Sequence, residues 1–282
     1  MSRLSREQIA FYECHGYAIL KDVIPTNDFH PLIRELNETV DRNLREAEAR
    51  GLLRKRFEDE PFARRLARGI EAIKDPSEKS FNSQIFRDLR FKLKTAGMFA
   101  VITHPAILDI VESLIGPEIL AHPQFNIRPK LPNQDSSVVP WHQDLAYLES
   151  DAELTFMVNF WIPLVDATAE NGCMQVIAAS HKSPLIRHVE NLGPGRNFRG
   201  ILDEDLPGGE RVLCPVKVGD LLLIRHKTIH RSLPNVSNHI RWSLDLRYSD
   251  PNMPTGRNYV PGFIARSRKN PSVMARSVDD WL

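Results

Sequence analysis

Cysteine is scarce in this sequence. The 282 residues include 3 cysteines, Cys14, Cys173 and Cys214, which are scattered and odd in number. This pattern argues against a disulfide scaffold or a cysteine-rich zinc site and favours free thiols in a reducing compartment. Residues 1–7 lack the apolar core of a signal peptide, and no apolar run approaches the roughly 20 residues of a membrane span. The sequence therefore predicts a cytoplasmic protein without membrane association.

Net charge is almost absent as well. The chain carries 37 basic and 36 acidic side chains, a formal charge of +1, so charge gives no reason to expect a nucleic-acid partner. An apolar fraction of 42% and a charged fraction of 26% are those of an ordinary globular protein. No repeat or low-complexity linker divides the chain, and nothing indicates an oligomeric state. We expect one domain over 1–282, helix-rich over residues 1–116, with a β-rich core at about 117–250 and a tail 251–282.

The N-terminal region of the chain has helical periodicity. Three helices are expected: Ser5 to Cys14, Thr26 or Asn27 to Arg50, and Pro105 to Leu114. Glycines follow each of them, as is typical of helix ends. The segment 51–91 mixes charges of both signs and is expected to be a solvated face or loop, with a lid or substrate wall as the alternative.

After Gly116 the pattern changes to short apolar or alternating runs separated by turn residues. Such a series predicts a β-sandwich or jelly roll, with the N-terminal helices covering one sheet. An earlier strand is expected at 17–20. The later strands are expected within 125–128, 154–164, 174–178, 212–218, 221–224 and 240–248.

The sequence Trp141-His142-Gln143-Asp144 carries the first candidate for chemistry. If this segment is extended, His142 and Asp144 point to the same face. An imidazole and a carboxylate on one face supply two of the three ligands of an iron-binding facial triad. The alternative is a loop whose two side chains contact only water or backbone.

A third ligand would be a histidine farther along the chain, and His230 has the most suggestive surroundings. A turn at Gly219-Asp220 and a buried strand at 221–224 precede it. A turn at Pro234-Asn235 and the strand 240–248 follow it, which predicts a hairpin. The histidines after Asp144 are His181, His188, His226, His230 and His239.

The strand 240–248 alternates in polarity. In one interpretation its polar face meets solvent, and in the other that face lines a cavity for charged small molecules while the apolar face packs on helices. The polar set is Arg241, Ser243, Asp245 and Arg247, and the apolar set is Trp242, Leu244, Leu246 and Tyr248.

Taken in order, these motifs resemble the phytanoyl-CoA dioxygenase family of iron(II)/2-oxoglutarate oxygenases over most of the chain. The matching elements are Gln8-Ile9-Ala10-Phe11-Tyr12 with Gly16-Tyr17, Trp141-His142-Gln143-Asp144, Glu170-Asn171-Gly172-Cys173-Met174, Ser180-His181-Lys182, Gly219-Asp220, His230-x-Ser232 and Arg241. The resemblance implies a mainly β protein with flanking helices, a double-stranded β-helix (a cupin-like jelly roll) backed by N-terminal α-helices.

For the metal, the resemblance implies that His142, Asp144 and His230 bind Fe(II). His226 is the nearest rival of His230, but it lacks a serine two residues on, where His230 has Ser232. Dioxygen and the cosubstrate 2-oxoglutarate would take the remaining positions on the metal. The implied reaction hydroxylates an unactivated C–H bond of a small-molecule substrate and releases succinate and carbon dioxide. Family members that halogenate replace the acidic ligand with a small residue, so the presence of Asp144 favours hydroxylation or a related oxidation.

For the cosubstrate, the resemblance implies binding by Arg241, Ser232 and Trp161. A guanidinium offers a planar donor fork to the far carboxylate of 2-oxoglutarate. Ser232 shares the face of His230 in an extended chain and can donate to the same carboxylate. Gln143 also matches a position beside the site, but a neighbour on a strand points away, so its role is expected to be indirect.

Three expectations stay open. Ala178-Ala179 stands where the family often has Pro-Gly, which puts the turn before Ser180 and His181 in question.

The competing functions are a non-catalytic jelly-roll binding protein and a metal-dependent cupin enzyme that does not use 2-oxoglutarate. Substrates in the family include acyl-CoA thioesters, amino acids, phosphonates and natural products. Four basic side chains are expected either to meet an anionic substrate or to lie on the surface. They are Arg128, Lys130, Arg247 and Arg257.

Overall fold

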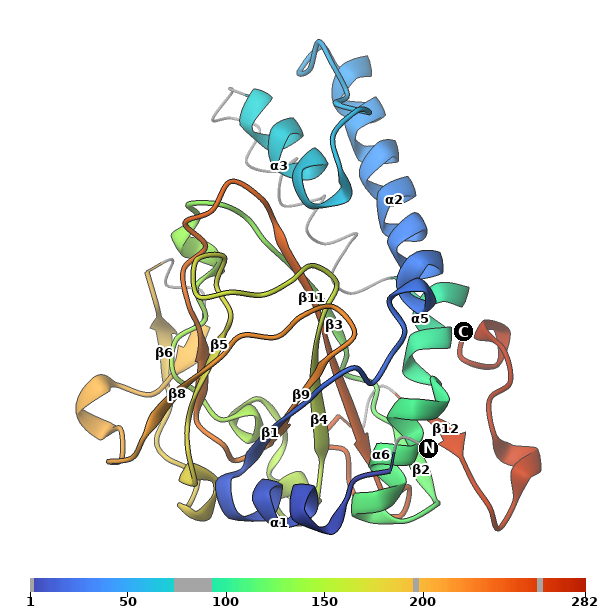
Figure 1. Ribbon diagram of the computed structural model, residues 1–282, viewed down its shortest axis with the longest axis vertical. Coiled ribbons are helices and arrows are strands. Elements are labelled where there is room, and N and C mark those ends of the chain that lie inside the picture. The colour runs from blue at the N-terminus through green and yellow to red at the C-terminus, as the bar shows by residue number, and fades with distance from the viewer. Residues whose placement is uncertain (1–2, 74–92, 195–197, 258–260) are drawn as a thin grey trace.

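Short strands separated by turns form the centre of the protein, as the sequence predicts (Figure 1). The computed structural model describes residues 3–73, 93–194, 198–257 and 261–282. The later stretch of the segment 51–91, from residue 74 onward, therefore lies outside the described residues. The strands are β1 (Tyr17–Leu20), β2 (Ile119–Ala121), β3 (Asn126–Lys130), β4 (Val158–Pro163), β5 (Met174–Ile177), β6 (Val189–Leu192), β7 (Phe198–Gly200), β8 (Arg211–Cys214), β9 (Leu221–Arg225), β10 (His230–Ser232), β11 (Arg241–Ser249) and β12 (Phe263–Arg266).

These strands pair antiparallel in every pairing among the described residues. A seven-stranded sheet has the order β1-β9-β4-β11-β2-β12, with β3 also paired to β11. A three-stranded sheet has the order β10-β5-β8, and β6 and β7 form a separate ribbon. The observed architecture is thus mainly β, with antiparallel sheets and flanking helices.

Five helices of the described chain lie mostly before the sheets. They are α1 (Arg6–His15), α2 (His30–Ala49), α3 (Phe62–Ala72), α5 (Ala96–Ile102) and α6 (Pro105–Ile115). Ser5 and Gln8 form a capping box at the start of α1, and Gly16 ends this helix with a φ of 77°. The second helix begins later than predicted, because Thr26–Phe29 form a 3-10 turn before α2.

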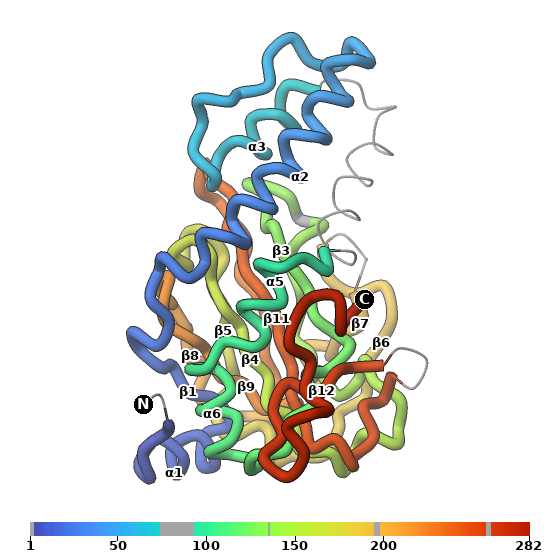
Figure 2. The backbone as a smooth tube through the Cα atoms, turned by 90° about the vertical axis from the view of Figure 1, so that its right-hand side faces the viewer, coloured from blue at the N-terminus to red at the C-terminus, as the bar shows by residue number. Residues whose placement is uncertain are grey.

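One face of the large sheet packs against these helices, and Figure 2 shows α5 and α6 in front of it. Trp242 stacks on Phe62 of α3 at 4.8 Å between ring centroids, and the Tyr248 hydroxyl donates to the Ile102 carbonyl at 2.7 Å. Trp242 and Tyr248 are both fully buried in the main core. The predicted division of β11 into a polar and an apolar face is confirmed, with α3 supplying the partner of Trp242.

The other face of the large sheet meets the small sheet. A second buried cluster joins the two, with side chains from β4 and β9 on one side and from β5 and β8 on the other. Its strand members are Trp161, Leu222, Ile224, Met174, Val176 and Cys214. Three members of this cluster, Trp161 and Ile224 of the large sheet and Met174 of the small sheet, also line a cavity between the sheets.

The predicted hairpin between His230 and Arg241 is wrong. β10 pairs with β5 in the small sheet, whereas β11 pairs with β3 and β4 in the large sheet. The turn at Pro234 and Asn235 carries the chain between sheets, and the Asn235 amide donates to the carbonyls of Lys130 and His239 at 2.8 Å each. A turn signal in the sequence marks a change of direction but does not identify the strand that receives the chain.

One apolar stretch is longer than expected. Among the described residues, Ala96–Ile115 has the length of a membrane span, with a mean hydropathy of 1.6 and 50% of its window buried in the protein. In the structure this stretch is two helices, because α5 ends at Ile102 and α6 begins at Pro105. Core helices of soluble proteins pass the same test, so the stretch is weak evidence for a membrane.

Candidate metal centre

His142, Asp144 and His230 converge on one point between the two sheets. One ligand atom from each lies within 4.8 Å of the others, and His142 Nε2 is 3.8 Å from Asp144 Oδ1. The backbones of the two histidines exchange both hydrogen bonds at 3.0 Å, so these residues stand directly opposite each other. The three residues singled out in the sequence are therefore brought together, although they come from segments about ninety residues apart in the chain.

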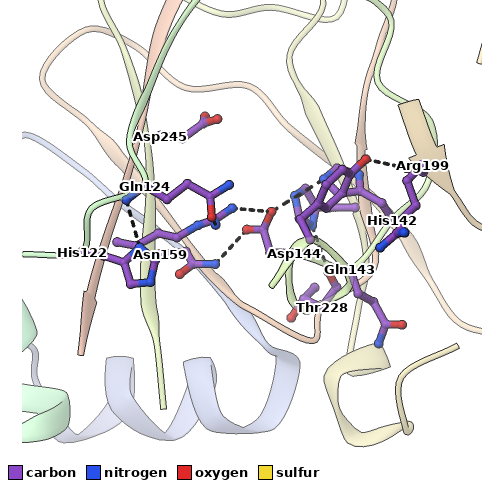
Figure 3. A network of polar contacts seen from close by, with 12 residues as sticks. His122, Gln124, His142, Gln143, Asp144, Asn159, Arg199, Thr228 and Asp245 are labelled. Carbon is purple, nitrogen blue, oxygen red and sulfur yellow. Dashed lines mark hydrogen bonds and ion pairs between the residues drawn. The ribbon is translucent and has the colours of Figure 1, made fainter. Parts of the chain in front are cut away.

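The route by which Asp144 reaches this point differs from the prediction. The segment is not extended through Asp144, because residues Asp144–Tyr147 form a 3-10 turn. The carboxylate is instead held by two side chains of the large sheet (Figure 3). Asn159 Nδ2 donates to Oδ2 at 2.8 Å, and Arg247 Nη2 donates to Oδ1 at 2.9 Å. Tertiary contacts rather than strand alternation orient this ligand.

Both imidazoles present Nε2 to the centre. His142 Nδ1 lies 2.9 Å from the Pro140 carbonyl, and His230 Nδ1 lies 2.9 Å from the Thr228 carbonyl. Because a carbonyl oxygen only accepts, each Nδ1 carries the proton and each Nε2 keeps its lone pair, as in metal-bound histidines. Burial, and then the neighbouring His230, lower the pKa of His142 to about 3, so its ring is neutral at pH 7.

The carboxylate is held in its charged form. Burial on its own raises the pKa of Asp144, but the charge of Arg247 leads the opposing effects, which keep this pKa well below its usual range. Two imidazoles and one carboxylate on one side of a point, with no further histidine, cysteine or carboxylate ligand grouped with them among the described residues, fit a divalent transition metal with open positions. The donor set thus suits the Fe(II) expected from the sequence.

A cavity of about 340 Å³ adjoins these residues, and three residues predicted for the cosubstrate line it. Arg241 is 3% exposed, its Nη1 donates to Ser243 Oγ at 2.7 Å, and its guanidinium lies 5.0 Å from the Trp161 ring centroid. Its Nε has no partner among the described residues. An unsatisfied guanidinium edge inside a cavity is a ready site for a carboxylate.

Lys130 is a further cavity residue, for which the sequence left substrate contact and surface placement open. It is 2% exposed, and its Nζ donates to Ser232 Oγ at 2.8 Å and to the Ser137 carbonyl at 2.7 Å. Burial, then the charges of Arg241 and Arg128, lower the pKa of Lys130 to about 6. Surface placement is therefore wrong for this residue. The sequence offered one signal for the cavity placement of Lys130, namely its position two residues after Arg128 on the same strand.

The other candidate cations have protein contacts. Arg247 is 5% exposed and bridges Asp144 and Gln124, so surface placement is wrong for it too. Arg257 donates to the Tyr147 carbonyl at 2.6 Å. Arg128 forms an ion pair with Asp245. Three of the four basic residues considered for an anionic substrate thus line the cavity, and Arg257 does not appear among its walls.

The remaining histidines lie elsewhere. His226 is buried but stands outside the group of possible metal ligands in the described chain. His181 contacts the Glu13 carbonyl at 3.0 Å, and His239 contacts the Asn171 amide at 3.1 Å. Gln143 points away from the centre and donates to the Lys227 carbonyl at 2.9 Å, so its expected indirect role agrees with its placement.

The turn before Ser180 keeps its shape without glycine. Ala179 has a φ of 60°, the left-handed conformation that glycine adopts easily. Ser180 Oγ then donates to the Ile177 carbonyl at 2.7 Å and accepts from the Ile229 amide at 2.8 Å. The substitution of Ala178-Ala179 for Pro-Gly therefore leaves a turn that anchors the residue next to His230.

Comparison with known proteins agrees with this geometry. A family model described as Phytanoyl-CoA dioxygenase (PhyH) matches residues 12–243. The peroxisomal phytanoyl-CoA dioxygenase of Bos taurus is 28% identical over 257 residues, which cover 88% of this chain and 69% of the bovine protein.

Solved structures also share the fold. The apo form of the non-heme monooxygenase ThoJ has a TM-score of 0.60 at 17% identity, covering 95% of this chain and 86% of ThoJ. The epimerase SnoN, in complex with Fe3+, alpha ketoglutarate and nogalamycin RO, has a TM-score of 0.55 at 19% identity, covering 96% of this chain and 92% of SnoN. At these identities the likeness concerns the fold.

Proposed function

The chain belongs to the phytanoyl-CoA dioxygenase family of iron(II)/2-oxoglutarate-dependent oxygenases, and on that premise we propose which residues carry the reaction. We propose that the protein is a 2-oxoglutarate-dependent dioxygenase of small molecules and that it hydroxylates an unactivated C–H bond. The observation that carries the assignment is the convergence of His142, Asp144 and His230 beside a cation-lined cavity.

His142, Asp144 and His230 hold the metal in this proposal. The carbonyls of Pro140 and Thr228 fix both rings with Nε2 toward the ion. When bound, iron(II) and 2-oxoglutarate would activate dioxygen, the oxidant: one of its oxygen atoms would enter succinate as 2-oxoglutarate loses carbon dioxide, and the other would enter the hydroxylated substrate. The protein's role is to present three ligands on one side of the ion and leave three positions open for the cosubstrate and dioxygen.

Arg241, Lys130 and Ser232 hold the far carboxylate of 2-oxoglutarate. Lys130 opposes Arg241 directly in the pairing of β3 with β11, and its Nζ is already bonded to Ser232. Two cations and a hydroxyl converge there in a buried place, where a charge-assisted bond is stronger than in water. Trp161 forms a wall of the same region, and its ring lies beneath the Arg241 guanidinium.

The sheet arrangement supports a finer architectural proposal. Two antiparallel sheets packed through an internal cluster, with the metal ligands between them, are the arrangement expected of a double-stranded β-helix. We propose that residues 1–282 form one such domain, helix-backed on the large sheet, and that the protein works in the cytoplasm.

The test couples cosubstrate consumption to metal binding. Purified protein is supplied with Fe(II), ascorbate, dioxygen and 2-oxoglutarate together with a metabolite library, and succinate is quantified. We expect succinate to form only with iron and to rise with a productive substrate. Asp144→Ala serves as the metal-site variant, and Asp151→Ala serves as a matched substitution of an acidic side chain outside the site.

The outcome also separates the competing functions. A non-catalytic binding protein would bind a ligand without succinate formation by wild-type protein. A metal-dependent enzyme of another kind would convert substrate without consuming 2-oxoglutarate. Either result would contradict the proposal.

A further inference from the structure

Arg128 presents an unused guanidinium edge to the cavity. Its Nε forms the ion pair with Asp245, and its two Nη atoms have no protein partner among the described residues. The residue lies on β3 opposite Ser243, two residue pairs along from the Lys130–Arg241 pair assigned above to the cosubstrate. The ion pair with Asp245 fixes the guanidinium plane, so its outer edge is oriented before any ligand arrives.

This edge is close to the metal centre and separate from the cosubstrate cations. Arg128 lines the same cavity as His142, Asp144 and His230, on the wall formed by β3. The Tyr147 ring in turn stands edge-on to His142, with 5.6 Å between centroids. A group held by Arg128 would therefore lie beside the metal, where a substrate must be held for oxidation.

The cavity keeps an excess of positive charge after both cofactors are counted. An iron(II) dication balances a 2-oxoglutarate dianion, and the histidine ligands are neutral imidazoles. Four basic side chains then face two carboxylates, and even a neutral Lys130 leaves the basic side in excess. These charged lining residues are Arg128, Lys130, Arg241, Arg247, Asp144 and Asp245. Burying that excess is unfavourable unless a further anion enters.

The rest of the wall is largely apolar. Apolar lining residues come from both sheets, from the loop before His142 and from β7. They are Val139, Trp161, Met174, Phe198 and Ile224, whereas Pro129, Phe160 and Leu246 also border the cavity but share the helix-side face of the large sheet with Trp242. The wall also includes the uncharged polar residues Gln134, Ser136, Ser137, Asn159 and Ser232, of which Asn159 is bonded to Asp144 and Ser232 to Lys130. A ligand that matches the excess of positive charge and the apolar part of the wall has an acidic group and an apolar body.

We propose that the primary substrate is a small carboxylic acid whose carboxylate binds the Nη edge of Arg128, with its apolar body against the cavity wall. This inference rests on the proposed function and names the substrate class of the same site. Asp245 is a positioning residue, because its carboxylate holds the Arg128 guanidinium through their ion pair.

The experiment uses a panel of medium-chain and cyclic carboxylic acids, each paired with its methyl ester and its primary amide, and the coenzyme A thioesters of the same acids. Binding to Mn(II)- and 2-oxoglutarate-loaded protein is measured by calorimetry without oxygen. Succinate formation is measured separately with Fe(II) and oxygen. The variants are Arg128→Gln, Arg128→Lys and, as a matched arginine on the outside of the small sheet, Arg231→Gln.

We expect at least one acid to bind at least ten times more tightly than its ester and amide, a preference lost in Arg128→Gln and partly kept in Arg128→Lys. The dissociation constant for 2-oxoglutarate should change less than about threefold in the same variants. Equal binding of acids and their neutral partners, including failure of every acid to bind, overturns the inference. Tighter binding of a coenzyme A thioester than of its free acid would also overturn the inference, because the charge of the thioester sits on phosphates far from the acyl group.

Two further outcomes are informative. If Arg128→Gln weakens 2-oxoglutarate as much as it weakens the acid, Arg128 belongs to the cosubstrate site and the inference fails. If wild-type protein binds neither Mn(II) nor 2-oxoglutarate, the proposed function fails first. The metal and cosubstrate titrations therefore separate the two failures before any acid is added.

Discussion

Arg247 donates to the same oxygen of Asp144 that faces the histidines. The distance from Arg247 Nη2 to Asp144 Oδ1 is 2.9 Å, and Oδ1 lies 3.8 Å from His142 Nε2. Arg247 is itself held through a hydrogen bond from its Nη1 to Gln124 Oε1 at 2.5 Å. The acidic ligand is thus shared between the metal position and a buried cation, which orients it and lowers its negative charge.

Removal of this contact should weaken metal binding. Arg247→Ala is expected to lower Mn(II) affinity by about 10- to 100-fold, the usual effect of losing a group that orients a ligand. Arg247→Gln can still donate a hydrogen bond and should retain most of the affinity. Calorimetric titration with Mn(II) measures both. Unchanged affinity in Arg247→Ala would show that Asn159 alone suffices to hold Asp144.

The buried histidines His226, just after β9, and His230, the first residue of β10, should differ in their effect on metal binding. His230→Ala removes a ligand atom and is expected to abolish stoichiometric Mn(II) binding, whereas His226→Ala should leave it intact because His226 lies outside the ligand group. Binding is followed by titration, and circular dichroism checks that both variants fold. Loss of metal binding in His226→Ala with binding retained in His230→Ala would reverse the assignment.

Arg241→Ala should weaken the cosubstrate far more than the metal. Loss of a buried charge pair is expected to cost about 2–5 kcal/mol of 2-oxoglutarate binding, a rise in the Michaelis constant of roughly 30-fold or more. Mn(II) affinity should stay close to that of the wild type. If 2-oxoglutarate dependence is unchanged, Arg241 is not a cosubstrate residue.

Lys130 should take up a proton when 2-oxoglutarate binds. With a pKa of about 6 in the ligand-free protein, Lys130 is mostly neutral above that pH. A bound carboxylate favours the charged form and raises the pKa, so affinity should fall as pH rises from about 6 toward the bound-state value. Calorimetry in buffers of different ionisation enthalpy counts the proton. Lys130→Met should show no such uptake, and buffer-independent heats in the wild type would contradict the assignment.

Trp242 tests the outer face of β11. Trp242→Ala removes a fully buried ring stacked on Phe62 and should cost about 3–5 kcal/mol of unfolding free energy. The folded fraction of Trp242→Ala should keep its affinity for 2-oxoglutarate, because the Trp242 ring lies on the helix side of the sheet. Denaturant unfolding and cosubstrate titration measure the two effects. A selective loss of 2-oxoglutarate binding without loss of stability would place the ring against the cavity.

The sequence by itself determined the local features of this protein. Alternation on the strand 240–248 put Arg241 and Trp242 on opposite faces, because successive side chains on a strand point to opposite sides, and the family resemblance assigned the face of Arg241 to the cavity. The order of motifs singled out His142, Asp144 and His230. These inferences were open to the sequence because they rest on periodicity and residue chemistry within short segments.

Only the tertiary structure decided which segments meet. It placed His230 and Arg241 in different sheets, although the turn between them suggested a hairpin. It also paired Arg247 with Asp144, 103 residues away, and Lys130 with Ser232, 102 residues away. Strand partners are chosen by packing of the whole core, and a local pattern carries no information about a partner so distant in the chain. The charge balance of the cavity, and with it the proposed acidic substrate, exists only once those segments are assembled.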